Sequence, residues 1–416
     1  MTALRITAMK LLFVAGLRGS VTLANVGLFA LIGAVFGADA VGRYATYLAF
    51  VMIFGSLMAC GLPQMLMRRS AIPANSHKNI AARLRSVYWL GWLIASTVGT
   101  LLIVPVFVWI NTATSLNAPI IAVTGPAAYA ASMMVMEELR GRGRPEQALL
   151  SEHTPTTLSP FAAVAVIAGF GLPETALIGA LVSVHVLAAA IFSAGYVALS
   201  GLRGSLREAA HVLSAIPVQQ LASMALMRCL AACSGYLAIL LVSIVTDVAV
   251  SGLVAVVQKL TGLASTLAAI VNSVYASRFG AARRSLSHLR KLMLQTAVLN
   301  GAGMTVVLAP MVAVPSLFLT FFSVGGDILG AETMLRLVAA SILLRGFCGT
   351  PDLLFLVTGK AWIEIAALSA SLAVLAAFVT LGPVSVIALG GAMAVSQILR
   401  LALSVMGVAW VLRGSA

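Results

Sequence analysis

Long runs of apolar residues, separated by short polar segments, recur along the whole of this 416-residue chain. Most runs reach about 20 residues, the length that a helix needs to cross the hydrocarbon core of a bilayer. The pattern predicts spanning helices near residues 11–36, 44–66, 87–110, 119–137, 157–172, 175–199, 216–245, 248–276, 292–314, 335–357, 362–381 and 386–412. A membrane β-barrel would instead show short segments of alternating polarity. We therefore predict an all-α polytopic membrane protein with about twelve transmembrane helices.

The composition agrees with this pattern and excludes an ordinary soluble domain. Hydrophobic residues make up 61% of the chain and charged residues only 9%, whereas about 25% of the residues of a soluble domain are charged. Such a chain could not cover a water-facing surface with polar groups. In a bilayer this is no obstacle, because a helix satisfies its own backbone hydrogen-bonding groups.

Positive charge is distributed unevenly over the loops between the predicted helices, and the formal net charge is +14. With the N-terminus inside, nineteen of the 26 basic residues fall in inside segments, and only Arg43 and Arg336 fall outside. The nineteen are Arg5, Lys10, Arg68, Arg69, Lys78, Arg83, Arg85, Arg140, Arg142, Arg144, Arg203, Arg207, Arg278, Arg283, Arg284, Arg290, Lys291, Lys360 and Arg413. The asymmetry predicts a bacterial inner-membrane protein with both termini in the cytoplasm. Such loops contact lipid headgroups, so we expect membrane lipids and no nucleic acid as partners.

The inside loop 200–214 lies midway along the chain, with six predicted helices on each side. We expect an N-terminal lobe, residues 1–199, and a C-terminal lobe, residues 215–416, around a central cavity, with 200–214 as a cytoplasmic linker. Six helices per half give both halves the same orientation in the membrane. Transporters often use such parallel repeats and bind substrate between them.

A faint internal repeat accompanies this division. An offset of 210 residues places Arg18 on Arg228 and Gly42 on Gly252. Identities among Leu, Ala and Val carry little information in so biased a sequence, whereas coincident arginines and glycines carry more. The repeat therefore predicts that the first helices of the two lobes carry equivalent arginines.

Five cations fall within predicted spans, where a charge at the bilayer centre costs at least about 2.5–3.5 kcal/mol. They are Arg18, Arg228, Lys259, Arg345 and Arg400. The spans hold few acids: Asp352 could pair with Arg345, and we expect Glu364 at the membrane interface. We therefore expect most of the cations to lack an internal salt bridge and to line a water-filled cavity that attracts anions.

Polar neighbours of two of these cations fall on single helix faces. Arg18, Thr22 and Asn25 follow one another at intervals of four and three residues, which is one stripe of a helix. A second stripe, with an interval of seven residues, begins at Lys259. Arg18 could instead extend to the cytoplasmic interface. The candidate substrate-binding residues are Arg18, Asn25, Arg228, Lys259, Arg345 and Arg400.

Motifs for catalysis or metal binding are missing from the sequence. The four cysteines form no CxxC pair, and no phosphate-binding loop or His/Asp/Glu cluster is visible. We predict no catalytic residues, no cofactor and no metal, and hence no enzyme. The sequences Gly61-Leu62-Pro63 and Gly349-Thr350-Pro351 predict bends within spans, where a transporter could gate.

Short motifs near the first two predicted helices carry a family signal. They are Phe36-Gly37 with Val41-Gly42-Arg43-Tyr44, then Gly61-Leu62 and Arg68-Arg69. Together with the six-plus-six topology, they resemble the polysaccharide-type (Wzx-like) lipid-linked oligosaccharide flippases of the multidrug/oligosaccharidyl-lipid/polysaccharide exporter (MOP) superfamily. The second half departs from the family pattern: Leu253 follows Gly252 where many members have a tyrosine, and Arg228 stands where an acid is common.

The resemblance implies outward flipping of an undecaprenyl-diphosphate-linked oligosaccharide by alternating access, for surface polysaccharide biosynthesis. The implied partners are this anionic lipid-linked oligosaccharide, membrane lipids and other glycan assembly proteins. Guanidinium groups bind phosphate oxygens through paired hydrogen bonds. We expect Arg18 and Arg228 to engage the diphosphate, and Lys259, Arg345 and Arg400 to extend the positive surface.

Two alternatives stay open. A cation-coupled exporter of drugs or metabolites with the same fold would need an intramembrane carboxylate, for which Asp352 is the candidate. A membrane glycan polymerase or acyltransferase would need a large periplasmic loop or a catalytic histidine with acidic partners. Neither feature is visible in the sequence.

Overall fold

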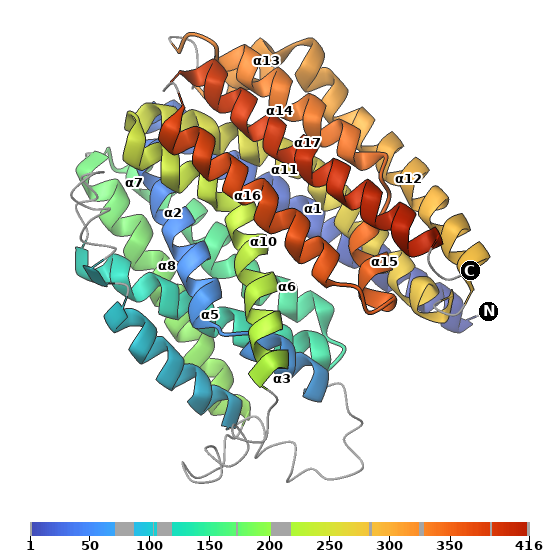
Figure 1. Cartoon of the computed structure of the whole chain (residues 1–416). Helices are drawn as coiled ribbons and strands as arrows, with labels where there is room; N and C mark the ends of the chain where they lie inside the picture. Colours follow the sequence, from blue (N-terminus) through green and yellow to red (C-terminus); the bar gives the residue numbers. More distant parts are fainter. Residues whose placement is uncertain are drawn as a thin grey trace. The chain divides into compact units, whose positions relative to one another are not determined.

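The computed structural model describes residues 2–70, 87–102, 104–105, 119–171, 174–200, 218–282, 285–323, 328–382 and 385–413. Every regular element in these ranges is helical (Figure 1). Eight of the described helices are long and apolar enough to cross a membrane, and a bent pair brings the number to nine. The predicted fold class, an all-α polytopic membrane protein, is confirmed.

Each of the twelve predicted spans overlaps a described helix. The first half contains α1 (Thr2–Phe36), α2 (Ala38–Met58), α3 (Leu62–Ser70), a helix at Val87–Leu102, α5 (Pro119–Gly141), α6 (Pro145–His153), the π-helix η1 (Thr154–Leu158), α7 (Ser159–Gly169) and α8 (Glu174–Ser200). The second half contains α10 (Val218–Val245), α11 (Val248–Ala282), α12 (Leu286–Ala313), α13 (Pro315–Phe321), α14 (Ala331–Gly346), α15 (Pro351–Val357), α16 (Trp362–Leu381) and α17 (Val386–Arg413).

Both predicted bends are present as helix breaks. Gly61 has a φ of +72° between α2 and α3, and Gly349 has a φ of +78° between α14 and α15, which meet at 43°. Glycine adopts this left-handed conformation without steric cost, and a proline in the first turn suits the helix that follows. The second break is capped from α12, where the Asn300 side-chain amide donates to the Gly349 carbonyl at 3.1 Å.

The fifth predicted span, 157–172, begins too late. The helix starts at Pro145 and continues through η1 to Gly169. Glu146, Glu152 and His153 interrupt the apolar run, and this polarity hid the first turns from a hydropathy pattern. The wide π turn is a local irregularity of a kind often found at functional sites.

By spatial proximity the chain forms two compact units. Unit 1 comprises Met1–Leu28 and Arg43–Ala232, and unit 2 comprises Phe29–Gly42 and Cys233–Ala416. Helices α1, α2 and α10 therefore contribute residues to both. The division into lobes 1–199 and 215–416 stays a prediction, since nearly all of the expected linker 200–214 lies outside the described residues.

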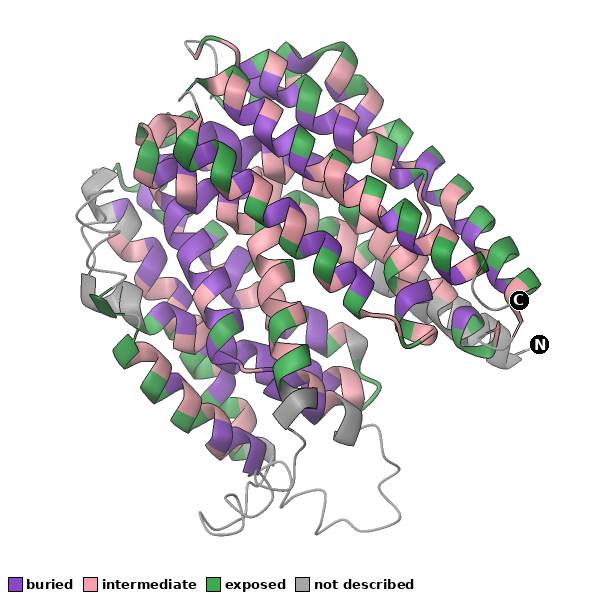
Figure 2. Cartoon of the chain, viewed as in Figure 1, coloured by how far each residue is buried: buried purple, intermediate pink, exposed green. Residues whose placement is uncertain are grey.

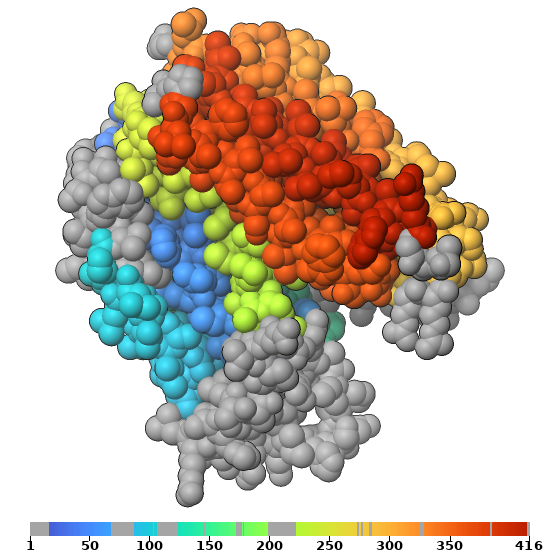
Figure 3. All heavy atoms as spheres, in the orientation of Figure 1, coloured from blue at the N-terminus to red at the C-terminus, as the bar shows by residue number. Residues whose placement is uncertain are grey.

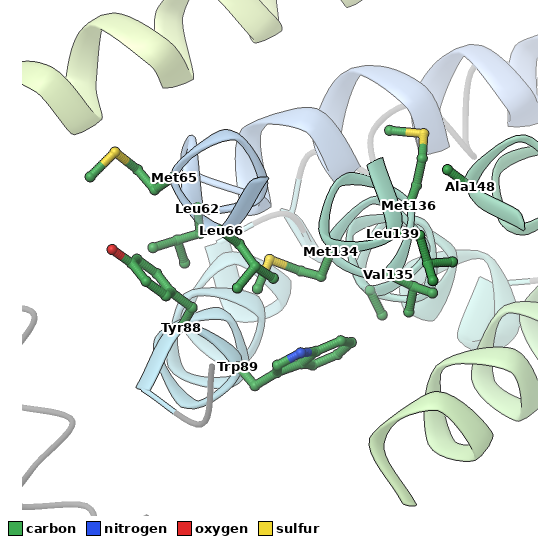
Figure 4. Close-up of a cluster of buried hydrophobic side chains, with 11 residues drawn as sticks. Leu62, Met65, Leu66, Tyr88, Trp89, Met134, Val135, Met136, Leu139 and Ala148 are labelled. Carbon is green, nitrogen blue, oxygen red and sulfur yellow. The ribbon is translucent and has the colours of Figure 1, made fainter. Parts of the chain in front are cut away.

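Unit 1 has an apolar core where α3, α5, α6 and the helix from Val87 meet (Figure 4). Leu66, Trp89 and Met134 are at most 5% exposed, and Leu139 lies in the same cluster. Trp89 also stacks edge-on against Trp92, with 5.4 Å between ring centroids. This packing holds the carboxyl end of α5, which carries acidic and basic side chains, in a fixed position.

Unit 2 has its own core among α11, α12, α15, α16 and α17. Phe279, Leu354 and Phe355 are fully buried there. The opposite helix faces are apolar too: on α12, Leu294 is 68% exposed and Val306 is 76% exposed. Figure 2 shows such exposed positions recurring along α12, and Figure 3 shows α16 and α17 at the surface. Apolar faces of this extent suit contact with lipid.

The predicted 210-residue offset corresponds to a reciprocal contact within unit 2. A methyl group on Gly42, in α2, would strike the Val248 carbonyl of α11. A methyl group on Gly252, in α11, would lie 2.8 Å from the Ala38 carbonyl of α2. Adding 210 to residue 42 gives 252, and adding 210 to residue 38 gives 248, so the two contacts are equivalent under the repeat. Such reciprocity is expected for elements related by a two-fold axis. The two glycines permit a close backbone approach that no larger residue would allow.

Candidate functional site

A network of charged side chains, here called the Glu152 cluster, lies in unit 1. It comprises Arg18 (α1), Glu137 and Arg140 (α5), Glu152 (α6) and Arg228 (α10). Arg228 Nη1 lies 3.2 Å from Glu137 Oε1, and Arg140 Nη1 lies 3.1 Å from the same oxygen. Arg140 Nη2 donates to Glu152 Oε2 at 2.8 Å. The network therefore links α5, α6 and α10.

Arg18 contributes an excess positive charge to the Glu152 cluster. Both Arg18 and Arg228 lie within electrostatic range of Glu152. Among the described residues, however, Arg18 forms no ion pair within 4 Å, unlike Arg140 and Arg228. Three arginines face two carboxylates, so the cluster is net positive. The two repeat-related arginines, Arg18 and Arg228, thus belong to one charged cluster.

The predicted stripe on the first helix faces the π turn of the fifth span. The Asn25 side-chain amide donates to Thr157 Oγ1 at 2.9 Å. Thr22 Oγ1 donates to the Arg18 carbonyl at 2.8 Å, within α1. Asn25 therefore joins α1 to η1 inside unit 1. Its assignment as a substrate-binding residue stays a prediction.

A second network, here called the Glu364 cluster, lies in unit 2 and comprises Arg345, Asp352, Glu364 and Arg400. Arg400 donates twice to Glu364 Oε1, from Nε at 3.2 Å and from Nη2 at 2.5 Å. Its remaining terminal nitrogen lies 3.3 Å from Ser234 Oγ. Glu364 is 5% exposed and neutralises Arg400, and its expected place at the membrane interface stays a prediction.

The possible ion pair between Arg345 and Asp352 does not form within 4 Å. Arg345 Nη1 lies 3.5 Å from Gln397 Oε1, at the outer limit of a hydrogen bond. Asp352 accepts a hydrogen bond from the Asn272 side-chain amide at 3.1 Å. The break between α14 and α15 separates the two residues, so a seven-residue spacing no longer places them on one continuous helix face.

The Glu364 cluster borders a cavity of about 210 Å³ in unit 2. Three buried oxygen atoms around it accept no hydrogen bond: Glu364 Oε2, Asn272 Oδ1 and Asn300 Oδ1. Buried acceptors of this kind usually bind water or an ion. The cavity is therefore suited to a small, hydrated or cationic occupant beside two arginines.

Lys259 stands apart from both clusters. Its ammonium lies 5.1 Å from the ring centroid of Phe29, on α1, and 5.4 Å from that of Tyr236, on α10. The partly buried side chain forms no ion pair with any described carboxylate. Aromatic faces stabilise a cation but accept none of the hydrogen bonds that an ammonium offers. Lys259 is thus held in place with its donors available.

The five cations differ in their partners. The expectation that most lack an internal salt bridge is wrong for Arg228 and Arg400, since each pairs with a buried glutamate. In the described part of the chain, Arg18, Lys259 and Arg345 form no salt bridge and match the expectation. The sequence reasoning missed Glu137, which is the last residue of the fourth predicted span, and Glu152, which lies five residues before the fifth.

Comparison with known proteins identifies the fold. No family model and no curated protein matches the chain. An inward-facing multidrug resistance MATE family transporter of the MOP superfamily matches with a TM-score of 0.65 and 16% identity, over 97% of this chain and 96% of that one. An outward-facing MATE transporter matches with a TM-score of 0.61 and 16% identity, over 98% and 96%.

A third similar structure is a MOP superfamily transporter from Pyrococcus furiosus, in which reversed polarity of the binding pocket suggests a different function. It matches with a TM-score of 0.59 and 15% identity, over 97% of this chain and 95% of that one. Over nearly its whole length, the chain therefore has the multi-pass fold of the MATE transporters of the MOP superfamily.

Proposed function

We propose that this protein flips an undecaprenyl-diphosphate-linked oligosaccharide from the cytoplasmic to the outer leaflet of a bacterial inner membrane, by alternating access, for surface polysaccharide biosynthesis. Both termini are cytoplasmic in this proposal, and the chain is a transporter rather than an enzyme. The fold supports transport, since its structural neighbours include inward-facing and outward-facing transporters.

The observation that carries the proposal is a set of spanning cations without anionic partners. Lys259 is held by two aromatic rings and pairs with no described carboxylate, and Arg18 forms no ion pair within 4 Å in that part of the chain. A charge in a spanning helix is costly and usually serves function. The diphosphate and sugar cannot cross hydrocarbon unaided. A diphosphate would supply the acceptor oxygens that these two side chains lack.

The paired cations have a different role in the proposal. Arg228 is neutralised by Glu137, and Arg400 is neutralised by Glu364. These two arginines position the clusters and hold the helices around them, while Arg18 in unit 1 and Lys259 in unit 2 each keep a positive charge that can attract a phosphate group. An interior-negative membrane potential favours outward movement of the anion, by about 2.3 kcal/mol per charge for each 100 mV.

The experiment is to delete the gene and locate the lipid-linked oligosaccharide with an impermeant probe on spheroplasts. We expect it to accumulate on the cytoplasmic face, with loss of surface glycan. The wild-type gene and Arg336→Ala should restore export, while Lys259→Met and Arg18→Gln should not, although both variants insert normally. Unchanged surface glycan and no trapped intermediate in the deleted strain would refute the proposal.

A second candidate function is cation-coupled export of drugs or metabolites. It is favoured by the cavity of unit 2, where the carboxylates of Asp352 and Glu364 and the orphaned amide oxygens of Asn272 and Asn300 could bind a cation. The nearby guanidinium groups of Arg345 and Arg400 weaken that site, because they repel cations. Drug efflux that depends on a sodium or proton gradient and is lost in Asp352→Asn would favour this candidate.

A further inference from the structure

A groove of about 580 Å³ lies on unit 1 between α5, α6 and α8, and no residue of the Glu152 cluster lines it. Its walls are apolar, with Leu139, Leu150, Ile191 and Phe192 contributing. Its size lies within the range of about 300–1,000 Å³ that is typical of ligand pockets. The role given to the Glu152 cluster does not involve this groove. The groove therefore needs a ligand of its own.

The apolar walls are exposed at the surface of unit 1. Ile191 is 63% exposed and Leu150 is 41% exposed, while Leu139, at 5%, connects the groove to the core of Figure 4. Gly195 lies in the α8 wall, and a methyl group built on it would meet nothing within 4 Å. The walls therefore leave room for a hydrocarbon chain.

Basic residues form the polar end of the groove, in the turn between α5 and α6. The Arg142 guanidinium is fixed by Glu138 and stacks over the Tyr196 ring, 5.7 Å from its centroid. Arg144 is exposed, reaches Gln147 Oε1 at 3.5 Å and pairs with no carboxylate among the described residues. One guanidinium is thus prepositioned and the other carries an uncompensated charge, an arrangement suited to a phosphate group.

We infer that the groove binds one anionic phospholipid. The phosphate contacts Arg144 and the outer edge of Arg142, and an acyl chain lies against Leu150, Ile191 and Phe192. A zwitterionic headgroup would bring its own cation towards two arginines, so charge complementarity selects an acidic lipid. The polyprenyl chain of a lipid-linked sugar is far longer than this groove can bury. The inference therefore does not depend on the proposed function.

Two variants and two matched controls test the groove. Gly195→Leu fills it at an exposed helix position with free space, so the fold should be retained. Gly235→Leu makes the same change at another open, exposed glycine, in α10 of unit 2. Arg144→Ala removes the unpaired guanidinium, and Arg336→Ala removes an exposed guanidinium far along the chain from the groove.

The measurement is native mass spectrometry of the purified full-length protein, titrated with phosphatidylglycerol or phosphatidylcholine. We expect one tightly retained phosphatidylglycerol per chain, with affinity about tenfold lower in Gly195→Leu and Arg144→Ala and unchanged in the two controls. Equal retention of phosphatidylcholine would overturn the inference, because selection by charge would then be absent. Equal phosphatidylglycerol affinity in all four variants, or displacement of the lipid only by a polyprenyl-diphosphate sugar, would also overturn it.

Discussion

The Glu152 cluster of unit 1 and the Glu364 cluster of unit 2 occupy related positions and have different chemistry. The 210-residue offset carries residue 152 to 362, two positions from Glu364, so each half holds a glutamate at a similar place in its fifth span. In the Glu152 cluster, three arginines face two acids, and Glu152 and Arg140 are 31% and 32% exposed. In the Glu364 cluster, two arginines face two acids, and the side chains of Glu364 and Arg400 are 7% and 12% exposed.

The difference in exposure and net charge suggests a structural role for the Glu364 cluster and a ligand-binding role for the Glu152 cluster. A buried, neutral pair is poorly placed to meet a substrate anion, because its charges are already satisfied. A partly exposed network with surplus positive charge can accept an anion without first breaking an ion pair. The Glu364 cluster is therefore expected to dominate stability, and the Glu152 cluster, together with Lys259, to dominate transport.

Glu364→Leu should have the largest effect on stability. It leaves the Arg400 guanidinium buried without a counter-charge, which costs about 3–5 kcal/mol when one partner of a buried pair is removed. The double variant Glu364→Leu, Arg400→Leu should recover most of that loss, since two apolar side chains can replace such a pair. The measurement is the fraction of detergent-purified protein that stays monodisperse after heating. A single variant as stable as the wild type would show that Arg400 is not truly buried.

Glu137→Leu should destabilise the protein less, by about 1–3 kcal/mol, because its two arginine partners keep access to water. Glu137 itself is 4% exposed, whereas Arg140 and Arg228 are 32% and 26% exposed. The same heating assay measures the loss. If Glu137→Leu cost as much as Glu364→Leu, the contrast between the more exposed ion pairs of Glu137 and the buried pair of Glu364 with Arg400 would fail.

Gly42→Ala and Gly252→Ala test the repeat on which the comparison depends. Each added methyl group would overlap a carbonyl of the facing helix, and overpacking of this kind costs about 1–3 kcal/mol. Gly235→Ala is the matched control, since nothing lies within 4 Å of its added methyl group. Thermal stability should fall in both repeat-related variants and stay level or rise in the control. A loss in only one of the two would break the reciprocity of the contact.

Arg336→Ala should have the smallest effect. Its guanidinium lies 3.4 Å from Glu332 in an i, i+4 pair, and both side chains are nearly half exposed. Such pairs contribute about 0.3–0.5 kcal/mol. The melting temperature should therefore be within error of the wild type. A large loss would mean that exposed pairs matter here as much as buried ones, and the ranking of the two clusters would lose its basis.

Hydropathy was sufficient to predict the helices, because a bilayer demands long apolar runs and leaves little choice of structure. Gly349 and Pro351 were likewise readable as a break, since their backbone preferences act locally. The start of the fifth span at Pro145 was not predicted, because Glu152 lowers the local hydropathy. A hydropathy average does not register that the charge of Glu152 is balanced by Arg140 on the neighbouring helix.

The charge partners could not be predicted, because they depend on tertiary packing. Arg228 and Glu137 are 91 residues apart, and Arg400 and Glu364 are 36 apart. Nothing in the local sequence of either arginine specifies which carboxylate will face it. Counting the acids at span edges, including Glu137, would have warned that these cations are not all free.

The most direct test of the account is the flipping rate of a fluorescent polyprenyl-diphosphate-linked oligosaccharide in reconstituted vesicles, read by an impermeant quencher. Wild-type protein and Arg336→Ala are compared with Lys259→Met, which keeps an apolar side chain between Phe29 and Tyr236 and removes the charge. The account predicts rapid exchange between leaflets for the first two and loss of nearly all exchange for Lys259→Met. An undiminished rate in a folded Lys259→Met protein would contradict the claim that unpaired cations carry the diphosphate.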